Sequence, residues 1–206
     1  MSRILDARSS EGQALAAEAA SAGGLIVLPT DTVYGIGARL DRPAALAALF
    51  GAKGRPRSLP LPVLVAGVDH ARTLGVFEGA AQRLAAAFWP GPLTIVVPRL
   101  GSLRADIGGD GATVGVRVPD HAGVRALLEL TGPLATTSAN RSGEPTPSTV
   151  EGVAGVFGDA VAVYLDGGTA LGGAPSTVVS VAGSTVEPLR EGALAFRDVL
   201  RAMGAA

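Results

Sequence analysis

Short apolar runs and helix-like segments alternate along the whole chain. Runs rich in valine, leucine and isoleucine predict strands at residues 25–28, 33–38, 61–65, 93–97, 114–118, 134–137, 161–165, 177–181 and 186–189. Polar and apolar positions at helical spacing predict helices at residues 10–22, 43–50, 80–88, 120–130 and 193–203. This alternation is typical of an α/β fold with a mixed sheet. The chain has no internal repeat and no low-complexity linker, so we predict a single domain over residues 1–206.

The composition excludes several classes of protein. Hydrophobic residues make up 48% of the 206, which is enough for a packed core and excludes intrinsic disorder. The absence of cysteine excludes a disulfide framework and a thiolate metal site, and two histidines exclude a multi-histidine centre. The sequence has neither an apolar run of membrane length nor a signal-peptide core at its N-terminus, so we expect a cytoplasmic protein.

The charged and rare residues narrow the choice of partner. Lysine and arginine number 17 and acidic residues 18, which gives a net charge of −1. A protein that binds mainly the nucleic-acid backbone usually has a clear basic excess, so this balance argues against that class. Lys53 is the only lysine and Asn140 the only asparagine. A chain that otherwise avoids both residue types makes these two positions candidates for function.

Polar clusters at the ends of predicted elements are the candidates for a site, because open α/β sheets bind ligands where strands end. The common motifs are absent: the sequence has no G-x-x-x-x-G-K-[ST] loop, no G-x-G-x-x-G after a strand and no G-x-S-x-G elbow. Four clusters remain, namely PTDTVYG at 29–35, KGRPR at 53–57, TTSANRSG at 136–143, and GGAPST at 172–177 with Arg190 after the next strand.

Each cluster also has a purely structural interpretation. Residues 29–35 fit a tight turn, which their spacing alone favours. The cations of residues 53–57 fit a solvated helix end or a phosphate site equally well. The polar groups of residues 136–143 exceed what a turn needs and favour a site, whereas one glycine pair is weak evidence for an anion site. Arg117 lies in an apolar strand and needs a partner, either an anionic ligand or a buried carboxylate.

In this order, the clusters resemble the YrdC/TsaC family of threonylcarbamoyl-AMP synthases. Each matching motif is weak alone, but the ordered series is specific and runs from about residue 25 to residue 193. The segments are PTDTVYGIG at 29–37, KGRP at 53–56, FWPGPLTIV at 88–96, VGVRVPD at 114–120, PLATTSANRSGEP at 133–145, DGG at 166–168, STVV at 176–179 and LREGA at 189–193.

The resemblance implies a twisted, mainly open mixed sheet with a positively lined concave face. It also implies a reaction in which L-threonine and bicarbonate give an N-carboxylated threonine, whose carboxylate attacks the α-phosphate of ATP. Pyrophosphate leaves and threonylcarbamoyl-AMP is formed, which makes the protein a nucleotidyltransferase. A Mg²⁺ ion held mainly by the phosphates is expected. In the family, the product passes to a separate transferase that modifies the adenosine beside the anticodon of certain tRNAs, so we expect tRNA to bind this chain only weakly or indirectly.

The resemblance also assigns the site residues. It implies that Lys53 and Arg55 are catalytic and meet the phosphates, where positive charge stabilises the transition state of adenylyl transfer. The implied threonine site is Thr30, Arg117 and Ser176, with Arg117 on the carboxylate. The implied ATP site adds to Lys53 and Arg55 the residues Thr94, Ser138, Asn140, Ser148 and Arg190.

Departures from the family pattern and two alternatives limit this assignment. Leu59, Leu64, Thr136 and Pro175 differ from the residues usual in the family, so contacts from those side chains are not carried over. One alternative is an RNA-binding or ribosome-maturation module that uses the same concave face, which the balanced charge and scarce aromatics disfavour. The other is a related protein that binds nucleotide without forming the adenylate, which the intact K-x-R and S-x-N motifs disfavour.

Overall fold

The computed structural model describes residues 2–170 and 173–204, so Gly172 of the fourth cluster lies outside the described residues. The strands are β1 (Arg3–Asp6), β2 (Ile26–Leu28), β3 (Gly35–Arg39), β4 (Val63–Leu64), β5 (Leu93–Pro98), β6 (Thr113–Arg117), β7 (Leu134–Ser138), β8 (Val163–Asp166), β9 (Thr177–Ala182) and β10 (Thr185–Arg190). The helices are α1 (Ser10–Ser21), α2 (Pro43–Lys53), α3 (Val68–Arg72), α4 (Gly79–Phe88), α5 (Ala122–Thr131), α6 (Val150–Phe157) and α7 (Phe196–Ala202), with a 3₁₀ turn η1 (Gly158–Ala160).

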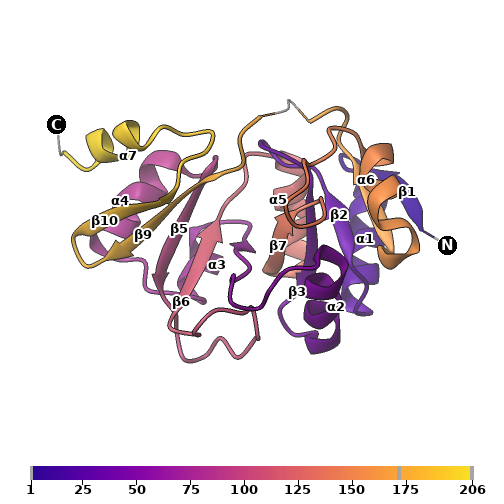
Figure 1. The fold of residues 1–206 in the computed structure, drawn as a ribbon, viewed down its shortest axis with the longest axis horizontal. Coiled ribbons are helices and arrows are strands. Elements are labelled where there is room, and N and C mark those ends of the chain that lie inside the picture. Colours follow the sequence, from indigo (N-terminus) through magenta and orange to yellow (C-terminus); the bar gives the residue numbers. More distant parts are fainter. Residues whose placement is uncertain (1, 171–172, 205–206) are drawn as a thin grey trace.

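The described strands form one sheet in the order β1-β8-β2-β3-β7-β4-β6-β5-β9-β10 (Figure 1). The pairs β1–β8, β2–β8, β4–β6 and β5–β9 are parallel, and the remaining pairs are antiparallel. The sheet is therefore mixed and has helices on both faces, which confirms the predicted fold class.

The strand register divides the core between the two faces of the sheet. One face, with Val27, Ile36 and Val116, packs against α2, α3, α4, α6 and α7. The opposite face, with Ile26 and Leu134, packs against α1 and α5. The hydrophobic cluster on this second face contains no residue of β5, β6, β9 or β10, so α1 and α5 cover only part of the face. The part left uncovered is available for a ligand.

Four described elements were not predicted from the sequence: β1, α3, α6 and the 3₁₀ turn η1. β1 is short and mostly exposed, and it exists because it pairs with β8, far away in the chain. α3 has only five residues, too few for a helical period to be visible. α6 contains two glycines, which lower helix propensity, but the Thr149 side chain caps it by accepting from the Gly152 N–H. No helix in the described ranges is long and apolar enough to cross a membrane.

Candidate functional site

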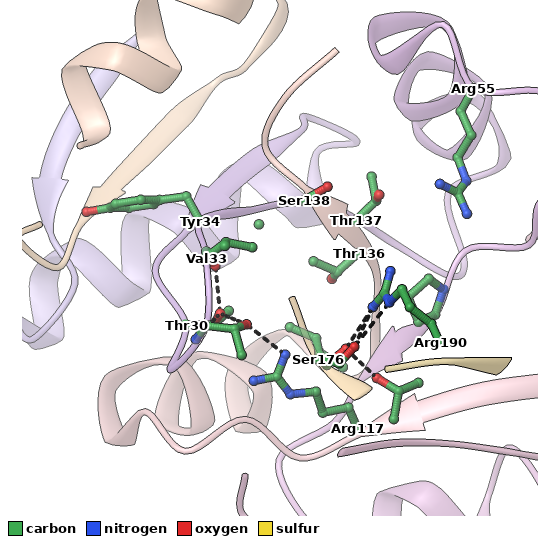
Figure 2. Close-up of a pocket in the computed structure, with 15 residues that line it drawn as sticks. Thr30, Val33, Tyr34, Arg55, Arg117, Thr136, Thr137, Ser138, Ser176 and Arg190 are labelled. Atoms are coloured by element: carbon green, nitrogen blue, oxygen red, sulfur yellow. Dashed lines mark hydrogen bonds between the residues drawn. The ribbon is translucent and has the colours of Figure 1, made fainter. Parts of the chain in front are cut away.

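A pocket of about 120 Å³ opens on the part of the sheet that α1 and α5 leave uncovered (Figure 2). The pairing of the strands places residues from neighbouring strands side by side at the floor of the pocket. Gly35 lies opposite Ser138 in the β3–β7 pair, and Leu64 lies opposite Arg117 in the β4–β6 pair. Side chains that alternate along strands thus reach one face from neighbouring strands. The lining residues are Thr30, Thr32, Val33, Tyr34, Gly35, Arg55, Pro62, Leu64, Thr94, Arg117, Thr136, Thr137, Ser138, Ser176 and Arg190.

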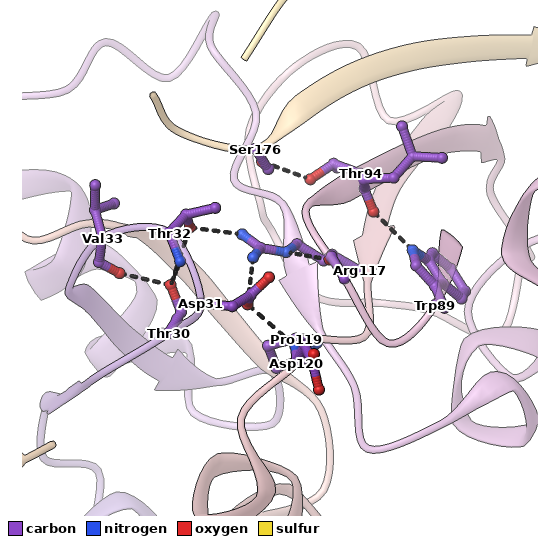
Figure 3. Close-up of polar contacts among 12 residues, drawn as sticks. Thr30, Asp31, Thr32, Val33, Trp89, Thr94, Arg117, Pro119, Asp120 and Ser176 are labelled. Carbon is purple, nitrogen blue, oxygen red and sulfur yellow. Dashed lines mark hydrogen bonds and ion pairs between the residues drawn. The ribbon is translucent and has the colours of Figure 1, made fainter. Parts of the chain in front are cut away.

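The turn between β2 and β3 presents two hydroxyl groups to the pocket. Thr30 Oγ1 donates to the carbonyl oxygen of Val33 at 2.6 Å and lies 3.0 Å from Thr32 Oγ1. The same Thr30 oxygen accepts from the Thr32 N–H at 3.2 Å. This is the tight turn that the spacing predicts, and it holds both side chains at fixed positions at the pocket wall (Figure 3).

Arg117 is held on three sides within the sheet. Its Nε donates to the carbonyl oxygen of Gly91 at 2.9 Å, its Nη1 to Thr32 Oγ1 at 3.0 Å, and its Nη2 to Asp31 Oδ1 at 2.5 Å (Figure 3). Burial lowers the pKa of Arg117, and the neighbouring Asp31 carboxylate opposes that effect. Asp31 is the buried carboxylate that the sequence left open as a partner. A guanidinium has five N–H donors, so these three bonds leave two for a ligand.

Arg55 and Arg190 bring two more guanidinium groups to the pocket (Figure 2). Arg55 donates to the carbonyl oxygens of Leu59 and Pro60, both at 3.0 Å, and Arg190 donates to the Ser176 carbonyl at 2.8 and 3.1 Å. Neither has a carboxylate partner in the part of the chain that the structure describes. Burial lowers the pKa of both, and the charges of Arg55 and Arg117 lower that of Arg190 further.

Thr94 and Ser176 complete the wall beneath Arg190. Their hydroxyl oxygens lie 2.9 Å apart across the β5–β9 pair, and Arg190 Nη2 donates to Ser176 Oγ at 3.1 Å. Both residues are buried, so their hydroxyls are held by these contacts. The structure thus brings together seven of the residues expected from the sequence, which are Thr30, Arg55, Thr94, Arg117, Ser138, Ser176 and Arg190.

Lys53 does not line the pocket. It ends α2 and is only 3% exposed, and Gly54, with φ of 60°, turns the chain so that Arg55 reaches the pocket instead. The ammonium group donates to the Ser138 carbonyl at 2.6 Å, to the Asn140 carbonyl, and to Asn140 Oδ1 at 3.1 Å. Burial and the nearby Arg55 charge lower the pKa of Lys53 to about 8. Direct contact between Lys53 and phosphate, which the sequence predicts, therefore stays a prediction.

Asn140 and Ser148 also lie outside the pocket lining. Asn140 is buried and fixes its own loop, because its amide donates to the carbonyl oxygens of Arg141 and Glu144 and its Oδ1 accepts from Thr146. Ser148 is exposed, and its carbonyl accepts from the Ala170 N–H. The nucleotide contacts expected of both residues stay predictions.

The positions that depart from the family pattern separate into two groups. Leu64 and Thr136 are buried and line the pocket, where Thr136 packs so closely against Gly35 that a Cβ there would lie 2.9 Å from its Cγ2. Leu59 is 48% exposed, and Pro175 serves through its carbonyl, which accepts from the Ala193 N–H. Leu59 and Pro175 are absent from the lining.

Several lining residues were not among those expected from the sequence. Thr32 and Tyr34 belong to the first cluster, but nothing in their spacing shows which side chains of a turn face a ligand. The hydroxyl of Tyr34 donates to the Gly168 carbonyl at 2.6 Å and accepts from the Gly167 N–H at 3.1 Å, which ties β3 to the end of β8. Contacts across so many residues are invisible in a sequence.

The pocket has the chemistry of a site for a small anionic molecule. Three guanidinium groups and several fixed hydroxyls surround it, and none of the carboxylates or imidazoles that the structure describes lines it. The described residues hold no group of three histidine, cysteine or acidic side chains that would bind a metal ion. Fold and site together define an α/β protein with a pocket suited to an anionic ligand at the ends of its strands.

The comparisons with known proteins identify the family. Residues 18–192 match the Sua5/YciO/YrdC family model, whose description is telomere recombination. A protein of Mycobacterium tuberculosis is 43% identical over 197 residues, which cover 95% of this chain and 90% of that protein. The threonylcarbamoyl-AMP synthase of Pyrococcus abyssi is 37% identical over 184 residues, 88% of this chain and 54% of that protein. The chain belongs to the Sua5/YciO/YrdC family, which confirms the resemblance predicted from the motifs.

A solved structure of a family member has the same fold as this chain. The crystal structure of P. abyssi Sua5 complexed with L-threonine superposes with a TM-score of 0.91 at 34% identity. The alignment covers 100% of this chain, which spans 61% of the Sua5 chain.

Proposed function

We propose that this protein is a threonylcarbamoyl-AMP synthase and, as such, a nucleotidyltransferase that uses ATP, L-threonine and bicarbonate. The observation that carries the proposal is the meeting of Arg55, Arg117 and Arg190 in one pocket, where Arg55 and Arg190 have no carboxylate partner among the described residues. Such a pocket suits a ligand with several negative charges beside one with a single carboxylate. The activity named for the P. abyssi relative, and the L-threonine in the Sua5 structure, support the same choice.

The amino acid would bind at the Arg117 end of the pocket. The two N–H groups that Arg117 keeps suit the threonine carboxylate, and the hydroxyls of Thr30 and Thr32 lie beside them. Ser176, on the opposite wall, would lie where amino acid and nucleotide meet. The amine nitrogen then attacks the carbon of bicarbonate and water leaves, which gives the N-carboxylated threonine.

The phosphates would bind at the Arg55 and Arg190 end. The new carboxylate attacks the α-phosphorus, the bond to the bridging oxygen of the β-phosphate breaks, and pyrophosphate leaves. Two guanidiniums fixed by backbone carbonyls offer charge to this transition state without reorganising. Because no carboxylate among the described residues lines the pocket, Mg²⁺ would be held mainly by phosphate oxygens and water.

Lys53 would act from beneath the Ser138–Asn140 segment. It fixes that segment through its carbonyl contacts, and in our proposal it exchanges part of them for a phosphate oxygen when ATP binds. The lowered pKa fits this role, because a desolvated ammonium gains most from an incoming negative charge. Asn140 and Ser148 would then meet the nucleotide through the loop that they share.

The decisive experiment measures pyrophosphate release from ATP with each substrate omitted in turn. We expect release only when L-threonine and bicarbonate are both present, because the nucleophile is made from the two. Equal release without threonine would leave a general ATPase and refute the assignment. We further propose that the product passes to a separate transferase for tRNA modification. Binding of tRNA to this chain alone should accordingly be weak and lost at moderate salt, and tight salt-resistant binding would favour an RNA-binding module.

A further inference from the structure

Asp31 lies directly behind the pocket and is absent from its lining. Its Oδ1 accepts from Arg117 Nη2 at 2.5 Å and from the backbone N–H of Asp120 at 3.1 Å (Figure 3). The Asp31 side chain is 15% exposed and that of Arg117 is 6% exposed. One carboxylate oxygen therefore joins the β2–β3 turn to the end of β6 and to the segment before α5.

The bonds around Asp31 continue to the surface of the pocket. Arg117 Nη1 donates to Thr32 Oγ1, which lies 3.0 Å from Thr30 Oγ1, and Thr30 in turn donates to the Val33 carbonyl. Because Thr30 uses its proton on Val33, Thr32 is the donor between the two hydroxyls. A continuous chain of hydrogen bonds therefore leads from the Arg117 guanidinium through Thr32 and Thr30 to the Val33 carbonyl. It ends in the β2–β3 turn, which also contains Asp31.

The charge of Asp31 matters less for the ligand than its position. Nε and Nη1 of Arg117 bond to neutral oxygens, so Asp31 is its one charged partner among the described residues. Without that acceptor, the guanidinium would keep its charge but would be held only by two neutral acceptors, the Gly91 carbonyl and Thr32 Oγ1, so its remaining N–H groups would be less firmly directed. A displacement of about 1 Å in a binding group commonly costs about 10²-fold in rate or affinity.

We propose that Asp31 is a positioning residue that acts through Arg117 and sets the direction in which this guanidinium meets the carboxylate of the amino-acid substrate. This inference rests on the proposed function. According to this inference, Asp31 touches neither substrate but affects the binding of threonine and not the binding of ATP.

The experiment compares Asp31→Asn with Asp31→Ala. The amide Oδ1 of asparagine accepts from both Arg117 and Asp120, so Asp31→Asn keeps the geometry and loses the charge. We expect the KM for L-threonine to rise by about 10- to 100-fold in Asp31→Ala and to stay within about 5-fold of the wild type in Asp31→Asn. The KM for ATP should change by less than about 2-fold in both. Asp31→Ser replaces Asp31→Ala if the alanine variant does not fold, since it admits water beside the guanidinium.

The matched control is Asp41→Ala, which removes a carboxylate that pairs with Arg39 at 2.9 Å on the protein surface. It should leave both KM values unchanged. The proposal is overturned if Asp31→Ala leaves the threonine KM unchanged, if both KM values rise together, or if Asp31→Asn is as impaired as Asp31→Ala.

A second readout separates this proposal from the proposed function. The ¹⁵N–¹H signal of Arg117 Nε, assigned from its loss in Arg117→Lys, reports the orientation of the guanidinium without any turnover. It should move in Asp31→Ala and stay in place in Asp31→Asn. If wild-type protein shows no threonine-dependent release of pyrophosphate but the signal behaves in this way, the proposed function fails while the positioning of Arg117 stands.

Discussion

The pKa of Lys53 gives a test that needs no assay of turnover. The side chain is 3% exposed, and burial together with the charge of Arg55 lowers its pKa from 10.5 to about 8. Between those two values, the unfolded chain binds more protons than the folded chain, so the free energy of unfolding rises with pH across this window. Below pH 8, the cost of the buried charge is fully present. At 1.36 kcal/mol per pKa unit, the gain by pH 10.5 is at most about 3 kcal/mol, because solvent around the loop screens part of it.

Urea unfolding of the wild type and of Lys53→Met at pH 7 to 10.5 measures this gain. The methionine variant keeps the apolar stem and removes the titrating group. The titration of the two tyrosines contributes equally to both proteins and therefore cancels in the difference between their free energies of unfolding. We expect the stability of the wild type relative to the variant to increase from pH 8 upward. Since Lys53 is the only lysine, a protein grown with ¹³C-labelled lysine gives one side-chain signal, whose midpoint should lie at about 8.

Addition of ATP to the labelled protein tests the phosphate contact. Phosphate charge beside the ammonium favours its protonated form, so the midpoint should move upward from about 8 toward the ordinary value of lysine. A midpoint above 10 before nucleotide is added would refute the desolvated geometry, and a midpoint that ATP does not move would refute the exchange of partners. Lys53→Arg should fold but lose about 10²–10³ in turnover, because the larger planar guanidinium cannot replace a compact ammonium under the loop.

Three further variants test other parts of the site. Arg190→Ala should raise the KM for ATP by more than about 10-fold and change the threonine KM far less, as separate titrations of each substrate will show, since no carboxylate in the described part of the chain pairs with Arg190. Gly167→Ala places a Cβ 2.6 Å from the Pro29 ring, so calorimetry should show a loss of about 1–3 kcal/mol and kinetics a raised threonine KM. Gly155→Ala, which meets open space, is its control and should do neither. Tyr34→Phe removes the hydroxyl that accepts from the Gly167 N–H and donates to the Gly168 carbonyl, and it should cost about 0.5–1.5 kcal/mol for each bond, measured by urea unfolding.

Long apolar strands and helices were predictable because their pattern is local. The predicted strand at residues 93–97 is β5 (Leu93–Pro98), and the predicted helix at 80–88 is α4 (Gly79–Phe88). β4 has only two residues, yet it lies between β6 and β7 and places Leu64 in the pocket. Its position depends on partners more than 50 residues away, which no local pattern encodes. The order of the strands in the sheet is unpredictable for the same reason.

The site was predictable in its residue types and less so in its contacts. The family resemblance that the ordered clusters carry implies one site for Arg55, Arg117 and Arg190, and the structure brings these three residues to one pocket. The sequence could not distinguish which cation of K-G-R faces the pocket, because that depends on the left-handed turn at Gly54. It could not identify Asp31 either, because an aspartate in a tight turn looks the same whether or not an arginine from another strand lies beside it.

The partners of the three guanidiniums match the charge of the ligand that each would bind. Arg55 and Arg190 are fixed by backbone carbonyls, which orient a guanidinium but leave its full charge for the phosphates. Arg117 is fixed by a carboxylate of opposite charge as well as by neutral oxygens, and it keeps two N–H groups for a single carboxylate. Most other arginines that pair with acidic residues do so on the exposed surface, as Arg8 does with Asp6. A chain with a net charge of −1 can therefore hold positive charge in one pocket, because most of its carboxylates lie elsewhere.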